Sequence, residues 1–203
     1  MELEEFYFYG MLDESSKSYL KENIKPITAT KGSILFFQGD TCEDILLLSH
    51  GELRLYIQGE KADIISLYHL KEGEQCIVNT SSAISPSPAI ATAETLCDIQ
   101  GWLLPKTSVK MLMRNNDKYQ DFIFSLFTSQ FSTLAETIEE IKFIRLEDRL
   151  LRWMKKQATP KVEITHEELA LELGSSRVVI SRALKALEAQ DKVSLHRGYI
   201  TLM

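Results

Sequence analysis

The sequence of 203 residues predicts an α+β protein with a β-rich N-terminal domain over residues 1–116, a long helix over 117–142 and a C-terminal module over 143–203. Three patterns support this division. Short apolar runs separated by turn residues fill the first part. Apolar residues recur at helical spacing through the second part. The third part combines short helices with a β-hairpin, and a chain of this length can bury two small cores.

The first domain is predicted to begin with a helix-like segment, 1–23, and to continue as short strands from Ile27 to about Leu104. The clearest strands are 34–37, 45–49, 52–57 and 63–70, with glycines in the turns at 39, 51 and 59. Many short antiparallel strands are typical of a jelly-roll, or double-stranded β-helix. Ser81–Pro88 is rich in small residues and proline, so we expect a loop there.

Apolar residues repeat along the helix 117–142 at alternating spacings of three and four. This seam consists of Phe124, Phe127, Phe131, Leu134, Ile138 and Ile141. The positions off the seam after Phe127 are mostly polar, and a narrow apolar stripe packs against another helix better than against a broad sheet. We therefore expect this helix to hold a homodimer together.

A helix-turn-helix is predicted in the C-terminal module, after a first helix over 143–157. Thr165 and Glu168 have the spacing of a capping box, which starts a helix at His166. Gly174 can end that helix because glycine readily adopts the left-handed backbone conformation.

The second helix of this motif, expected at about 176–188, has two unlike faces. Ser175 or Ser176 can cap its start. Its apolar face carries Ile180, Ala183, Leu184 and Leu187, and its polar face carries Arg177, Val178, Ser181, Arg182 and Lys185. A short helix, a glycine turn and a helix with a basic, hydroxylic face suit insertion into a DNA major groove. Alternating residues around the turn His196-Arg197-Gly198 then predict a hairpin, or wing, whose tip can reach a phosphate.

These motifs resemble the CRP/FNR family of transcription regulators. Thr165–Glu188 is similar to that family's winged helix in the pattern T-x-x-E-L-A-x-x-L-G-S-S-R-x-x-x-S-R-x-L-x-x-L-E, and residues 31–57 and 67–74 are similar to its β-roll sensor domain. The resemblance covers nearly the whole chain. It implies a homodimer that binds a palindromic operator in double-stranded DNA and works with RNA polymerase.

The resemblance also implies which residues contact DNA. Arg177 and Arg182 occupy base- and phosphate-contacting positions, and Arg suits the paired acceptors of guanine. Many relatives carry Glu where this chain has Val178, so we expect a different base to be read there. The remaining expected contacts, mostly to phosphates, are Thr165, His166, Ser175, Ser176, Ser181, Lys185 and Arg197.

The distribution of charge favours DNA binding by the C-terminal module. Residues 1–142 hold 12 Lys/Arg and 21 Asp/Glu, a net charge of −9, whereas residues 143–203 hold 11 and 8, a net charge of +3. An acidic protein can bind DNA when its basic residues gather in one module. No stretch approaches the roughly 20 apolar residues of a membrane span, and the acidic N-terminus is unlike a signal peptide. We expect a cytoplasmic protein.

The effector of the first domain is not predicted. Cyclic-nucleotide-binding relatives hold the ribose with a Gly-Glu pair and the phosphate with an Arg-Ser pair, and these positions look like Ile77-Val78 and Ser87-Pro88 here. Between Lys71 and Lys106 the chain has no Arg or Lys. A cyclic phosphate would lack its usual partner, so we do not expect cyclic AMP to bind. The pocket is expected to involve Glu74, Cys76, Ile77, Val78 and Ser87.

Three kinds of signal remain open. The pocket could take an uncharged or cationic small ligand, or a haem with His50, His69, Cys76 or a Met as axial ligand. The third possibility is that no ligand binds, and that activity is set by the protein level or by oxidation of a thiol. The cysteines at 42, 76 and 97 are scattered, so the sequence predicts neither a zinc site nor an iron–sulfur cluster.

A metal-dependent, cupin-like jelly-roll enzyme fused to a DNA-binding module is the alternative from another class. Such enzymes need two or three His and a carboxylate around one metal. The first 142 residues contain only His50 and His69, with no H-x-H spacing. We therefore expect a binding protein with no catalytic residues and no metal.

Overall fold

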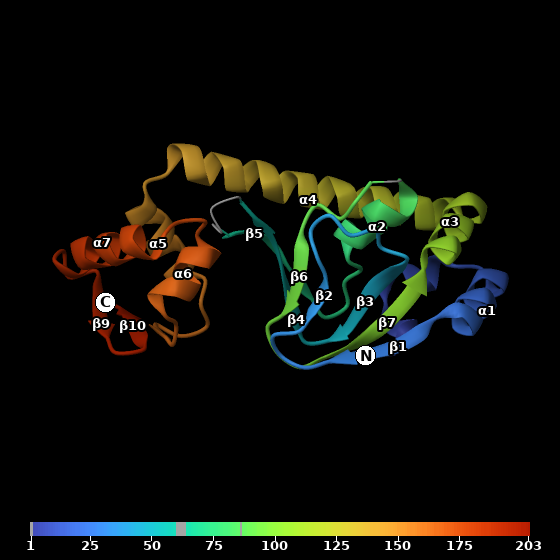
Figure 1. The fold of residues 1–203 in the computed structure, drawn as a ribbon, viewed down its shortest axis with the longest axis horizontal. Coiled ribbons are helices and arrows are strands. Elements are labelled where there is room, and N and C mark those ends of the chain that lie inside the picture. The colour runs from blue at the N-terminus through green and yellow to red at the C-terminus, as the bar shows by residue number, and fades with distance from the viewer. Residues whose placement is uncertain (1, 60–63, 86) are drawn as a thin grey trace. The chain divides into compact units, whose positions relative to one another are not determined.

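The computed structural model describes residues 2–59, 64–85 and 87–203, without the side chains of residues 137 and 140–142. It has the predicted α+β fold, with antiparallel sheets, a long helix and a C-terminal helical module (Figure 1). Two compact units are present, the first comprising residues 1–58 and 67–131 and the second residues 59–66 and 132–203, so that one boundary falls within the long helix.

The first unit begins with two 3₁₀ turns, Leu3–Glu5 and Tyr7–Met11, and the helix α1, Glu14–Asn23. The prediction of one helix-like segment over 1–23 is therefore correct only for its second half. The helix starts anew because the Asp13 carboxylate accepts a hydrogen bond from the Ser16 amide, 2.7 Å away, which caps α1.

Seven strands follow, and they form two antiparallel sheets, the β-roll. One sheet has the order β1-β7-β3 and the other the order β2-β6-β4-β5. The strands are β1 Lys25–Ala29, β2 Ile34–Phe36, β3 Asp44–His50, β4 Glu52–Gln58, β5 Ile64–Lys71, β6 Thr92–Thr95 and β7 Ile99–Pro105. Gly51 joins β3 to β4 at a φ of 97°, and a Cβ there would lie 2.8 Å from the Asp98 carbonyl oxygen. This turn therefore requires glycine.

The helix α2, Ile77–Ile84, occupies part of the segment that we expected to be a loop. The prediction is wrong for residues 81–84. Most of α2 is buried, and the helix packs against α3 (Lys106–Asn115) and β3. Burial of small side chains in these contacts outweighs the weak helix propensity of serine.

The helix α4 runs over Asp117–Phe143, and its environment changes along its length. Near its start, Tyr119 and Ile123 are fully buried in the core of the first unit, beside Phe8 and Leu112. From Phe127 onward, the side chains that the structure describes are exposed, apart from Gln130, which is half-buried.

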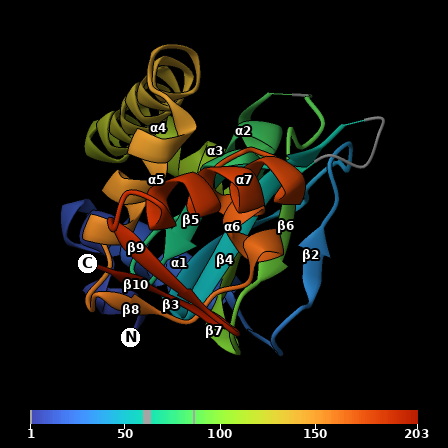
Figure 2. The same cartoon turned by 90° about the vertical axis from the view of Figure 1, so that its left-hand side faces the viewer.

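After the end of α4, the described residues of the second unit form three helices and a small sheet, seen with α7 in front in Figure 2. Its elements are α5 Leu146–Lys155, β8 Lys161–Val162, α6 His166–Glu172, α7 Arg177–Glu188, β9 Val193–His196 and β10 Tyr199–Leu202. The first helix starts at 146 rather than at the expected 143, because α4 continues through Phe143 and Arg145 has extended backbone. The strand β8 pairs with β10 and adds a third strand to the predicted hairpin.

Candidate DNA interface

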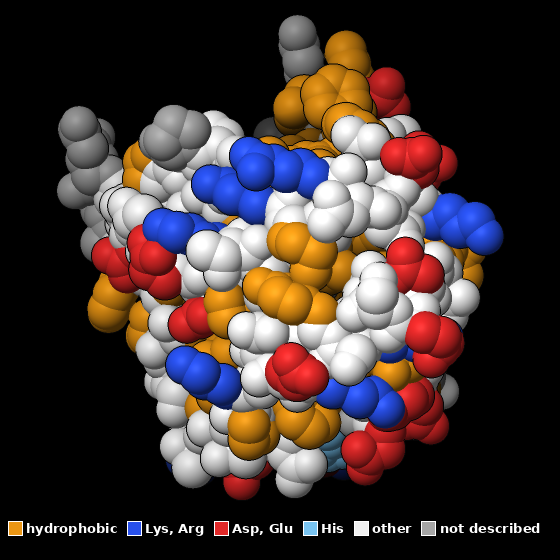
Figure 3. Space-filling view, turned by 90° about the vertical axis from the view of Figure 1, so that its right-hand side faces the viewer, with side chains coloured by type: hydrophobic (Ala, Val, Ile, Leu, Met, Phe, Trp, Pro, Cys, Tyr) orange, Lys and Arg blue, Asp and Glu red, His pale blue; other side chains and the backbone are white. Residues whose placement is uncertain are grey.

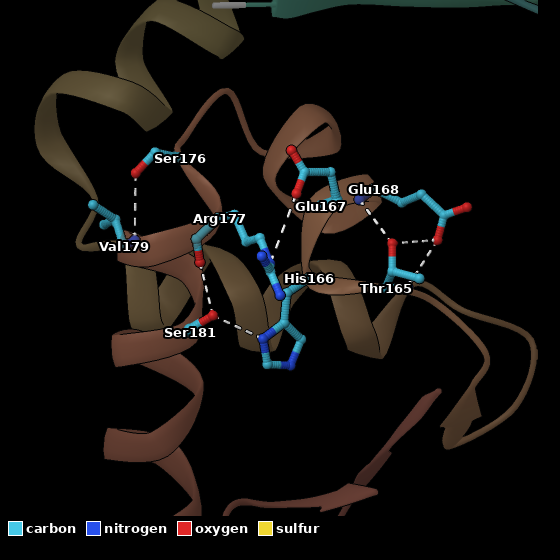
Figure 4. Close-up of polar contacts among 8 residues, drawn as sticks. All are labelled: Thr165, His166, Glu167, Glu168, Ser176, Arg177, Val179 and Ser181. Atoms are coloured by element: carbon cyan, nitrogen blue, oxygen red, sulfur yellow. Dashed lines mark hydrogen bonds and ion pairs between the residues drawn. The ribbon is translucent and has the colours of Figure 1, made fainter. Parts of the chain in front are cut away.

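The start of α6 and the turn between α6 and α7 are built from the predicted capping residues. The Thr165 hydroxyl accepts a hydrogen bond from the Glu168 amide, at 3.1 Å, while the Thr165 amide donates to the Glu168 carboxylate, at 2.8 Å (Figure 4). Gly174 has a φ of 57°, in the left-handed region. Of the two candidate caps for α7, Ser176 is used, and its hydroxyl accepts from the Val179 amide. These local bonds set α7 relative to α6.

The two faces of α7 differ as predicted. Its apolar side chains are buried with those of α5 and α6 in one core, which includes Leu150, Met154, Leu169, Ile180, Leu184 and Leu187. Its opposite face is open to solvent and carries Arg177, Val178, Arg182 and Lys185, with Ser181 half-buried. Val178 is 59% exposed, and Val179, which sequence reasoning did not single out, is 45% exposed.

His166 is tied to α7 through a chain of two hydrogen bonds. The Ser181 hydroxyl donates to the Arg177 carbonyl oxygen, and His166 Nδ1 lies 2.8 Å from the same hydroxyl oxygen. Because the hydroxyl hydrogen is already donated, His166 Nδ1 must carry the proton in this contact. The other ring nitrogen, Nε2, points away from Ser181 (Figure 4).

Residues from both helix starts and from the wing line one concavity of about 360 Å³. Its lining includes Thr165, His166, Glu167, Arg177, His196 and Gly198. The guanidinium Nε of Arg177 lies 3.7 Å from the Glu167 carboxylate, with both side chains exposed. Such surface ion pairs are weak, so Arg177 stays free to meet another acceptor. Glu167 was not predicted, since the contact becomes visible only once α6 and α7 are packed.

The remaining expected DNA contacts lie apart from this concavity. Arg182 and Lys185 are exposed further along α7, and Arg197 is exposed at the tip of the wing. The wing itself is ordered by side-chain stacking. The rings of His196 and Tyr199 are stacked at 4.4 Å, and Lys161 Nζ lies 4.3 Å from the Tyr199 ring centre. Ser175 is half-buried in the turn.

The residues expected in the effector pocket have different environments. Cys76, Ile77 and Val78 are buried at the start of α2, whereas Glu74 and Ser87 are exposed. The Glu74 carboxylate accepts a hydrogen bond from the Lys71 amide, at 2.8 Å. The joint role of these five residues stays a prediction.

The buried thiols are poorly suited to redox chemistry. Burial raises the pKa of Cys76 above its ordinary value, and burial raises the pKa of Cys42 to about 11. Both thiols are therefore protonated near neutral pH, and the thiolate is the reactive form. Cys97 is exposed.

The histidines of the β-roll each face a carboxylate. His50 Nδ1 lies 3.2 Å from Glu72, and His69 Nδ1 lies 2.8 Å from Glu52. Within the described part of the chain, no three His, Cys, Asp or Glu side chains converge as a possible metal site. None of the helices in that part has the length and apolar character to cross a membrane.

The seam of α4 is uncovered in the single chain. Its described side chains are between 36% and 75% exposed, in the order Phe124 57%, Phe127 36%, Phe131 75%, Leu134 37% and Ile138 62%. The side chain of Ile141 lies outside the described residues. Figure 3 shows one face of the molecule, on which hydrophobic side chains are interspersed with acidic and basic ones.

A β-roll followed by a long helix and a winged helix-turn-helix defines a class of transcription regulators, and comparisons with known proteins agree. Residues 26–116 match the family model of the cyclic nucleotide-binding domain, and residues 144–203 match that of the Crp-like helix-turn-helix domain. The chain belongs to the CRP/FNR family of transcriptional regulators.

Several relatives share this arrangement over nearly their whole length. A structure from Eubacterium rectale, assigned to the same family, is 28% identical, with a TM-score of 0.88 over 97% of this chain and 93% of that one. The cyclic AMP receptor protein of Thermus thermophilus is 24% identical over 95% of this chain and 90% of its own. The c-di-GMP-responsive regulator CLP of Xanthomonas campestris is 14% identical, with a TM-score of 0.79 over 94% and 99% of the two chains.

Proposed function

We propose that this regulator binds a palindromic operator as a homodimer and reads it with α7. In this proposal, residues 1–116 form the sensor domain, 117–142 the dimerisation helix and 143–203 the DNA-binding domain. The observation that carries the proposal is the open face of α7, where Arg177, Val178, Arg182 and Lys185 are all exposed while the opposite face is packed. A helix that is packed on one side and exposes a basic face on the other fits the DNA major groove.

Arg177 and Val178 are proposed to select bases at the start of α7. A guanidinium can donate two hydrogen bonds to O6 and N7 of guanine, and the contact discriminates by roughly 1–3 kcal/mol. An isopropyl group cannot accept from the cytosine amine as a glutamate does, but it packs well on a thymine methyl. The operator should therefore differ from the site of Glu-bearing relatives at the base pair that Val178 meets.

The phosphate contacts are proposed to be shared between the two helix starts and the wing. Lys185 and Arg197 are exposed cations, and His166 lines the same concavity as Arg177 with its Nε2 turned away from Ser181. Ser175 and Ser176 are close to the start of α7, where backbone amides also favour anions. The hydroxyls of Thr165 and Ser181 already donate within the protein, so their role is to hold α6 and His166 in place.

Selection from randomised duplex DNA tests this proposal. We expect a palindrome with half-site centres about 34 Å apart, carrying guanine at the Arg177 position and an A·T pair at the Val178 position. The matched variant Val178→Glu should shift the second preference to C·G. Enrichment of the C·G pair by the unaltered protein would refute this assignment.

The homodimer is proposed to form along the α4 seam. Five apolar side chains aligned on one helical face are costly to leave in water, and a second copy of the same helix would cover them. A two-fold axis through this seam would also present two copies of α7 to the two half-sites.

Cyclic AMP is not expected to bind, although the family model is named for cyclic nucleotides. Ile77 and Val78 are buried apolar residues at the start of α2, and the stretch between Lys71 and Lys106 offers no cation to a phosphate. Isothermal titration calorimetry with cyclic AMP, with cyclic GMP as the control, should give no heat of binding below millimolar concentrations. A dissociation constant in the low micromolar range would overturn the argument from the missing arginine.

The wider role follows from the family. We propose a non-enzymatic regulator that acts in the cytoplasm, where the chromosome and RNA polymerase are found. The signal remains one of the three kinds set out above, although the protonated buried thiols weigh against oxidation.

A further inference from the structure

The β-roll contains a pocket of about 410 Å³ that is separate from the expected effector residues. None of Glu74, Cys76, Ile77, Val78 and Ser87 lines it. Four strands supply an apolar wall, with Ile27 from β1, Leu35 from β2, Leu46 from β3 and Leu103 from β7. A cavity of this size and character accommodates a small organic molecule.

Three carboxylates, Asp40, Glu43 and Asp44, line the same pocket from the loop before β3 and from its first residue. Asp40 accepts a hydrogen bond from the Phe37 amide, at 2.8 Å, and Glu43 is paired with Lys106. Among the described residues no hydrogen bond or ion pair reaches the half-buried carboxylate of Asp44. The pocket therefore keeps an excess of negative charge, which attracts cations and repels anions.

A buried polar group gives independent support for a ligand. Asn79 on α2 lines the pocket, is only 3% exposed, and has a side-chain oxygen with no hydrogen-bond partner in the described part of the structure. A buried acceptor left without a partner costs about 1–3 kcal/mol, so such groups in native proteins require an explanation. A bound N–H donor would satisfy this one.

We propose that this pocket binds a small organic cation, a primary amine with an apolar body. The ammonium group has three N–H donors, which would be shared between the Asp44 carboxylate and the Asn79 side-chain oxygen, and the apolar body would lie against Leu35, Leu46 and Leu103. A metal ion fits less well, because Ca²⁺ and Mg²⁺ require about six oxygen ligands and the described residues present no convergent group of three acidic, His or Cys side chains.

Thermal unfolding of the full-length protein with 2-phenylethylamine tests the proposal. The amine at millimolar concentration should raise Tm, whereas its neutral analogue 2-phenylethanol and its anionic analogue phenylacetate should not. Equal shifts with the amine and the alcohol, or no shift with the amine, would overturn the proposal. This comparison uses the unaltered protein, so it does not depend on the folding of a variant.

Two variants locate the site. Asp44→Asn should weaken amine affinity about tenfold, because it removes a charge-assisted hydrogen bond. Asn79→Leu should also weaken it while leaving Tm without amine equal or higher, since an unpaired buried amide is replaced by an apolar group of similar size. Glu22→Gln, a matched loss of negative charge on α1, should change nothing. Unchanged amine affinity in Asp44→Asn would contradict the proposed site.

Discussion

Leu134→Asp is expected to dissociate the homodimer into monomers. Leu134 lies in the middle of the seam, so a two-fold dimer would bury two aspartates close together. Burying charges without partners costs several kcal/mol, and each step of about 1.4 kcal/mol raises the dissociation constant tenfold. Light scattering at micromolar concentration should therefore give the mass of the monomer for the variant and twice that mass for the unaltered protein.

The matched control places the same charge beside the seam. Ser132 is exposed on α4 and is not a seam residue, so Ser132→Asp should remain dimeric. Circular dichroism should show the same helix content for both variants. If Leu134→Asp stayed dimeric at micromolar concentration, the interface would lie elsewhere on the molecule.

Arg177→Ala is expected to weaken binding to the operator far more than binding to unrelated DNA. Each half-site would lose a bidentate contact to guanine worth roughly 1–3 kcal/mol, while most of the phosphate contacts remain. Fluorescence anisotropy with the selected operator and with a scrambled duplex gives the two affinities. Equal loss on both duplexes would mean that Arg177 contacts only the backbone.

Lys185→Ala should behave differently, because a phosphate contact is independent of sequence. Both affinities should fall together, and the slope of log affinity against log salt should lose about 0.9 for each phosphate contact removed. Lys155→Ala on α5, a matched loss of charge in the same module, should change the slope less. A selective loss of operator binding in Lys185→Ala would instead place this lysine at a base edge.

The helix-turn-helix could be predicted from the sequence because its signals are local. The capping box of Thr165 and Glu168, the left-handed Gly174 and the apolar period of α7 each act within a few residues, and all three appear in the structure as expected. The strands of the β-roll could also be predicted, because their apolar runs are bounded by turns such as the one at Gly51. The side chains expected to contact DNA were taken from the resemblance, and their role stays a prediction.

Features that depend on contacts between distant residues appeared only in the tertiary structure. The strand β8 exists because Lys161 and Val162 pair with β10, some forty positions later, and α2 forms because its small residues are buried against β3 and α3. Neither partner is visible in a local pattern. The contact of His166 with Ser181 likewise requires α6 and α7 to be packed.

The β-roll pocket lined by Asp40, Glu43, Asp44 and Asn79 also could not be predicted from local patterns. In the sequence, the stretch that holds Asp40, Glu43 and Asp44 has the pattern of a solvated turn. Asn79 is one polar residue in a stretch of small ones. Folding of the β-roll places them around one cavity with Ile27 and Leu103. The sequence by itself determined the fold class and the DNA-binding helix, because short-range hydrogen bonds and periodicity encode them. The tertiary structure decided where the cavity lies, because a cavity is lined by residues that only folding brings together.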